Sequence, residues 1–114
     1  MRLMKLLKSF NFSLNGVKLL LKEQNFVIHL FALFVVIFVA IYIELNYLEW
    51  IVLLLTCGFV ISLEAINTAI EKMCDLISKE KSKEIKTIKD ISAASVLIQA
   101  LISIVIALLL LSKI

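Results

Sequence analysis

Three long apolar stretches, separated by short polar segments, are the feature that most constrains the fold of this chain. They cover residues 26–43, 50–63 and 91–111. Hydrophobic residues make up 62% of the 114 residues, against about 45–50% in soluble domains. A soluble protein of this size could not bury so much apolar surface, so lipid or partner subunits must cover it.

Long helices are the structure that these stretches favour. The chain has no proline and only two glycines, so few positions interrupt a helix. A stretch of about 20 apolar residues is long enough to cross a bilayer as a helix. We therefore predict an all-α integral membrane protein, a single domain over residues 1–114, with transmembrane helices at about 26–45, 50–72 and 91–111.

An amphipathic segment precedes the first of these spans. Between residues 2 and 22, apolar side chains recur at helical spacing within one face, while five basic residues lie elsewhere. A basic amphipathic helix beside a span is typical of an interfacial helix that lies on anionic lipid. A cleaved targeting peptide is a weaker alternative, because the segment runs directly into the polar residue Glu23.

The distribution of basic residues predicts the orientation in the membrane. Residues 2–22 and 79–89 are rich in lysine and arginine, whereas residues 44–49 contain neither. The positive-inside rule then places the amino terminus and the second loop in the cytoplasm, and the carboxy terminus outside. The net charge of +3 is modest and does not suggest a nucleic-acid partner.

An acidic face lies at the inner end of the second span. Glu64, Asn67, Glu71 and Asp75 fall within roughly 80° of the helix circumference. If Trp50 marks the outer interface, Glu64 lies about 21 Å along the axis, inside the inner leaflet. An unpaired ionisable group there costs on the order of 2.5–3.5 kcal/mol. A solvated helix end explains Asp75 and part of Glu71, but it does not explain Glu64 and Asn67.

Other polar residues converge on the same membrane face. Glu23 immediately precedes the first span, and Lys89 and Asp90 immediately precede the third. Carboxylates that meet there would repel unless a cation joined them, and such oxygen ligands suit Mg²⁺ held together with phosphate. The position of Glu64 suits a general base that takes a proton from a lipid hydroxyl. The chain has no G-x-x-x-x-G-K-[ST] loop, so a nucleotide would bind without that scaffold.

These same residues carry a family resemblance. The run Glu64-Ala-Ile-Asn67-Thr-Ala-Ile-Glu71, followed by Asp75 and by the Lys89-Asp90 pair, resembles the prokaryotic diacylglycerol kinase family, which includes the undecaprenol kinases of Gram-positive bacteria. The stretch 23–29 resembles the E-x-N-F-x-x-H motif of that family, and residues 48–50 resemble its L/I-E-W turn. The resemblance extends from Glu23 to about residue 106.

The resemblance implies a homotrimer in the bacterial cytoplasmic membrane that transfers the γ-phosphate of ATP to a membrane lipid hydroxyl. Its active site would lie at the cytoplasmic interface. By motif, Glu64 would be the catalytic base, Asn67 a polar group of the active site, and Glu23 and Glu71 the Mg²⁺ ligands. The residues that would contact ATP are Glu23, Glu71, Asp75, Glu80, Lys89 and Asp90.

Several alternatives stay open at this point. The acceptor lipid could be diacylglycerol or undecaprenol. A non-catalytic membrane assembly protein could use Glu64, Asn67, Ser92 and Gln99 as a structural polar network, and an ion or proton carrier could use Glu64 alone. His29 could contact substrate or a subunit interface, but we expect an interhelical hydrogen-bonded histidine and do not include it in the predicted site.

Overall fold

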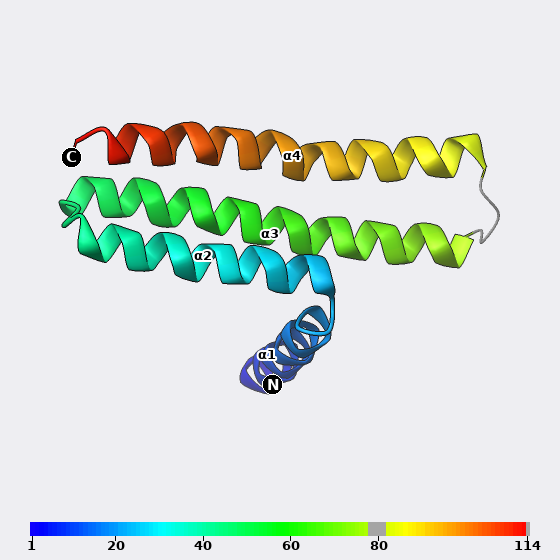
Figure 1. Cartoon of the computed structure of the whole chain (residues 1–114). Helices are drawn as coiled ribbons and strands as arrows, with labels where there is room; N and C mark the ends of the chain where they lie inside the picture. Colours follow the sequence, from blue (N-terminus) through cyan, green and yellow to red (C-terminus); the bar gives the residue numbers. More distant parts are fainter. Residues whose placement is uncertain (78–81, 114) are drawn as a thin grey trace.

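Four helices make up most of the part of the chain that the structure describes (Figure 1). The structure, a computed structural model, describes residues 1–77 and 82–113. Helix α1 covers Arg2–Leu20, α2 Gln24–Tyr42, α3 Tyr47–Ile77 and α4 Lys83–Leu111. The described residues include no strand, and α2, α3 and α4 are each long and apolar enough to cross a membrane. The predicted all-α fold with three membrane-spanning helices is therefore confirmed.

Two of these helices extend well past the apolar stretches. Helix α3 has 31 residues, a length of about 46 Å, and α4 has 29, about 44 Å. Both exceed the roughly 30 Å hydrocarbon core of a bilayer. Hydropathy marks where a helix lies in lipid but not where it ends, so α3 continues to Ile77 and α4 already begins at Lys83. Their polar ends therefore extend beyond the apolar stretches.

Helix α3 is the central helix and packs against both of its neighbours. Figure 1 shows α3 between α2 and α4, and its most extensive packing is against α4. Most large apolar side chains of the three helices point outward and are exposed, as lipid-covered helices require. The buried residues of α3 include a large polar share: Leu53, Thr56, Glu64, Asn67, Thr68 and Cys74.

A tight connection joins α2 to α3. The Asn46 carboxamide oxygen accepts a hydrogen bond from the Glu49 N–H at 2.9 Å, and Glu49 Oε1 accepts one from the Asn46 N–H at 2.9 Å. This reciprocal pair is a capping box that satisfies free N–H groups at the start of α3. Glu49 also forms an ion pair with Lys113, just after the end of α4. All three helices are thus fixed relative to one another at this end of the protein.

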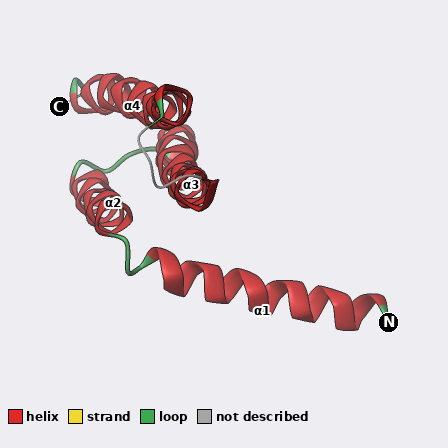
Figure 2. Ribbon diagram, turned by 90° about the vertical axis from the view of Figure 1, so that its right-hand side faces the viewer, coloured by secondary structure: helices red, strands yellow, loops and turns green. Residues whose placement is uncertain are grey.

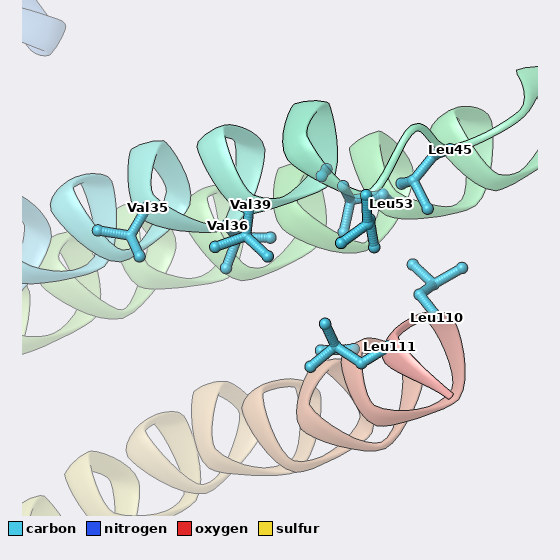
Figure 3. Close-up of a pocket in the computed structure, with 10 residues that line it drawn as sticks. Val35, Val36, Val39, Leu45, Leu53, Leu110 and Leu111 are labelled. Atoms are coloured by element: carbon cyan, nitrogen blue, oxygen red, sulfur yellow. The ribbon is translucent and has the colours of Figure 1, made fainter. Parts of the chain in front are cut away.

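Two apolar cavities lie along the gap between α2 and α4. The first, which we call the end cavity, has a volume of about 170 Å³ and lies near the α2–α3 connection, lined by residues that include Val39, Leu53 and Leu110 (Figure 3). The second, the central cavity, has a volume of about 220 Å³ and extends toward His29. Both are lined by Val36 and Ala107, so the gap is continuous along α3.

Helix α1 points away from the other three (Figure 2). None of its residues is buried, and its apolar side chains are exposed. Only its carboxy-terminal half approaches α3, where Ser13, Gly16 and Val17 face Ala65 and Thr68 across a cleft. A helix with one apolar face and no protein partner suits the surface of a bilayer, and the interfacial location stays a prediction.

The capping box gives a first prediction. Replacing Asn46 with alanine removes the side-chain acceptor at the start of α3 and should lower the free energy of unfolding by about 1 kcal/mol. Asn46→Asp retains an acceptor and should lose much less. Denaturation of both variants in detergent micelles measures the difference. Equal losses in the two variants would show that the cap does not stabilise α3.

Candidate active site along helix α3

The acidic face of α3 passes from a buried to an exposed environment along the helix. Glu64 and Asn67 are only 4% and 5% exposed, Glu71 is half-buried, and Asp75 is exposed. One helix face therefore presents a buried carboxylate and amide, followed two turns later by carboxylates in contact with water. Solvation cannot account for Glu64 and Asn67, whose polar groups depend on neighbouring helices.

Glu64 lies at the contact between α3 and α2. Its Oε2 atom is 3.7 Å from Nε2 of His29, one and a half turns into α2. Its backbone carbonyl also accepts a hydrogen bond from the Thr68 hydroxyl at 2.9 Å. The sequence interpretation left His29 outside the site. The structure instead places its imidazole beside the carboxylate of the proposed base.

Asn67 connects α3 to α4. The Ser92 hydroxyl donates to Asn67 Oδ1 at 2.6 Å, and the Asn67 amide donates to Glu71 Oε1 at 3.0 Å. A buried amide is costly unless both its oxygen and its nitrogen have partners, and here both do. The chain Ser92–Asn67–Glu71 fixes one carboxylate oxygen of Glu71.

A second connection between α3 and α4 lies at the exposed end. Lys89 Nζ is 2.6 Å from Asp75 Oδ1, so these two predicted nucleotide-contacting residues meet. Asp90 is instead exposed and pairs with Lys86 on its own helix at 2.6 Å. Glu80, also predicted to contact ATP, lies outside the described residues.

Glu23 reaches the same end of α3 from the start of α2. It is the residue before the first turn of α2, and its Oε1 atom is 2.8 Å from Lys72 Nζ. Lys72 follows Glu71 directly, so the ion pair brings Glu23 to the acidic end of α3. The sequence interpretation did not include Lys72. Its position between Glu71 and Asp75, as a basic residue in an acidic segment, could have indicated an ion pair.

The predicted magnesium ligands agree with the chemistry of that ion. Among residues 1–77 and 82–113, no group of three or more His, Cys, Asp or Glu side chains could hold a metal ion. Mg²⁺ usually takes only one or two carboxylates and completes its octahedron with phosphate and water. Glu23 and Glu71 would supply two such carboxylates near the exposed end of α3, and the Mg²⁺ site stays a prediction.

Comparison with known proteins identifies the class of protein. The family model described as prokaryotic diacylglycerol kinase matches residues 11–111. The undecaprenol kinase of Bacillus subtilis is 39% identical over 87 residues, which cover 76% of this chain and 71% of that protein. A diacylglycerol kinase of Synechocystis is 36% identical over 103 residues, covering 89% of this chain and 59% of that protein. A diacylglycerol kinase of Helicobacter pylori is 33% identical over 96 residues, covering 82% and 74%.

The chain therefore belongs to the prokaryotic diacylglycerol kinase family, and its enzyme class is lipid kinase. This confirms the resemblance drawn from the Glu64–Glu71 motif. It also argues against the alternatives of a non-catalytic assembly protein and an ion carrier, because neither is a kinase.

The hydrogen bond between Ser92 and Asn67 gives a second prediction. Ser92→Ala leaves the buried Asn67 oxygen without its donor and should lower the free energy of unfolding by about 1 kcal/mol. Ser95→Ala is the matched control, because the Ser95 hydroxyl donates to the Ser92 carbonyl of its own helix at 2.7 Å. Unfolding in detergent micelles compares the two. A larger loss for Ser95→Ala would contradict the interhelical role of Ser92.

Proposed function

We propose that this lipid kinase transfers the γ-phosphate of Mg-ATP to the hydroxyl of a membrane lipid at the cytoplasmic face of the bilayer. The observation that carries the proposal is the burial gradient on α3. Glu64 is buried among the spanning helices, while Glu71 and Asp75 lie on the same face closer to water. The two substrates would approach one helix face from opposite directions, the lipid through the membrane and the nucleotide from the cytoplasm.

In the proposed reaction, Glu64 takes the proton from the lipid hydroxyl. The lipid oxygen forms a bond to the γ-phosphorus, the bond from that phosphorus to the bridging oxygen breaks, and ADP leaves with the electron pair. The proton passes from Glu64 to water after the transfer. Such in-line transfers need mainly orientation and neutralisation of charge. Asn67 contributes to orientation, because it fixes Glu71 relative to the base.

The exposed end of the face would bind the nucleotide. Lys89 would neutralise phosphate oxygens, with Asp75 holding its ammonium in place. Asp90 and Glu80 remain proposed ATP contacts from the family motif. Bound at Glu23 and Glu71, Mg²⁺ would neutralise charge on the phosphates. Lys72 would compete for Glu23 before the ion binds, because it now holds one oxygen of that carboxylate.

Undecaprenol is the acceptor that we expect. The relative with 39% identity is named an undecaprenol kinase, while the diacylglycerol kinases of Synechocystis and Helicobacter pylori are 36% and 33% identical. Side-by-side assays of the purified protein with undecaprenol and with a diacylglycerol in mixed micelles compare the two lipids. A higher kcat/KM for diacylglycerol would overturn this assignment.

The proposal includes the predicted orientation and assembly: a homotrimer in the bacterial cytoplasmic membrane, with the amino terminus inside and the carboxy terminus outside. Orientation can be tested in a variant with Cys57→Ala and Cys74→Ala. A single cysteine at Tyr47, the first residue of α3, should react with a membrane-impermeant maleimide in intact cells, and one at Lys86 only after lysis. The reverse pattern would contradict the orientation.

Removal of the proposed base gives the central prediction. Glu64→Gln should lower kcat by about 10²- to 10⁴-fold, the usual contribution of a general base. Glu71→Gln should instead raise the Mg²⁺ concentration needed for half-maximal activity, because it removes a proposed ligand. Transfer of label from γ-labelled ATP to lipid measures both effects.

Glu84→Gln is the matched control, because Glu84 is an exposed carboxylate in the first turn of α4, outside the proposed site. It should leave activity and Mg²⁺ dependence unchanged. Full activity of Glu64→Gln would exclude Glu64 as the base. Absence of label transfer by the unmodified protein to any lipid alcohol would exclude the proposed reaction.

A further inference from the structure

His29 lies between the proposed base and the central cavity. One side of its ring faces Glu64, with Nε2 3.7 Å from Oε2. The residue also lines the central cavity between α2 and α4. A histidine in a membrane-spanning helix is costly unless a polar neighbour or a function offsets the cost. His29 has a polar neighbour in the Glu64 carboxylate. It also lines the central cavity, through which an acceptor could approach that carboxylate.

The geometry of the pair suits a catalytic contact. The Glu64 side chain is 5% exposed and that of His29 is 28% exposed, so the carboxylate is sealed and the imidazole is partly open. A separation of 3.7 Å is longer than a hydrogen bond, which usually measures about 2.7–3.2 Å. Hydrogen bonds of active sites are often long before substrate binds and shorten in the complex. A small rotation of either side chain would allow the Nε2–H group to donate to Oε2.

The cavity beside His29 suits a hydrocarbon chain. Its lining comes from α2, α3 and α4 and is mainly alanine, valine, leucine and isoleucine. The lining residue Ser103 donates its hydroxyl to the Gln99 carbonyl of its own helix at 2.8 Å. The imidazole of His29 therefore marks the polar end of an apolar space. A lipid alcohol with its chain in the cavity would bring its hydroxyl toward this end, beside Glu64.

We propose that His29 is a positioning residue, which orients the Glu64 carboxylate toward the hydroxyl of a lipid whose chain lies in the central cavity. The proposal rests on the proposed function of Glu64 as the base. His29 keeps its own proton throughout and donates Nε2–H to Oε2 of Glu64. The lipid proton goes to Glu64, as in the proposed reaction. His29 therefore acts through Glu64 and makes no bond to the phosphate.

Three substitutions at one position test this role. His29→Gln retains an N–H donor close to the place of Nε2 and should keep kcat within about threefold of the unmodified protein. His29→Asn is polar but too short to reach Oε2, and His29→Leu has no donor. Both should lower kcat by about 10- to 100-fold, less than loss of the base itself, while KM for Mg-ATP stays unchanged. Glu84→Gln, which lies outside both the proposed site and the central cavity, should leave kcat unchanged.

The assays use the full chain in mixed micelles with undecaprenol and, separately, dioleoylglycerol, at saturating Mg-ATP. Combining His29→Leu with Glu64→Gln should produce no further loss beyond that of Glu64→Gln, because His29 acts through that carboxylate. The proposal is overturned if His29→Asn and His29→Gln have the same kcat. It is also overturned if adding His29→Leu to Glu64→Gln lowers kcat by as large a factor as His29→Leu does alone. Failure of the unmodified protein to phosphorylate either lipid would instead refute the proposed function.

Discussion

The burial of a carboxylate within the membrane is the constraint on which the rest of this structure depends. Glu64 is almost fully enclosed, and an ionisable group at such depth requires polar neighbours from other helices. Helix α3 meets this requirement by lying between α2 and α4, so that its acidic face contacts both. Glu64 meets His29 of α2, and Asn67 meets Ser92 of α4. These contacts fix the register of three helices whose other surfaces are largely apolar and suited to lipid.

Helix α3 is long enough to carry its acidic face from the buried Glu64 to exposed residues near its end. Eleven residues separate Glu64 from Asp75, a rise of about 16 Å along the axis. Over that distance the face changes from a sealed environment to an exposed one. A lipid hydroxyl and a nucleotide phosphate require opposite surroundings, since one substrate is held by hydrocarbon and the other by charge. A single rigid helix can present groups to both without a mobile segment between them.

Sequence alone predicts much of this arrangement, because its signals are local. The lengths of the apolar stretches predicted the three spanning helices. The helical repeat of 3.6 residues placed Glu64, Asn67, Glu71 and Asp75 on one face. The cross-helix partners could not be found in this way. Whether His29 meets Glu64 depends on how far α2 is displaced and rotated against α3, and no local pattern encodes that register. The paired Lys89 and Asp90 show the same limit, because adjacent residues on a helix point in different directions and only Lys89 reaches α3.

The ion pair between Glu23 and Lys72 bears on the proposed Mg²⁺ site, because it engages one of the two proposed ligands. Carboxylates at the end of α3 repel one another, and Lys72 offsets part of that repulsion by holding Glu23. Its side chain is 63% exposed, so solvent screens the pair and its contribution to stability is small. In the proposed reaction, a divalent ion bound together with phosphate would therefore displace Lys72 at little cost. The ammonium group that is released would then be close to the phosphates, where a positive charge favours transfer.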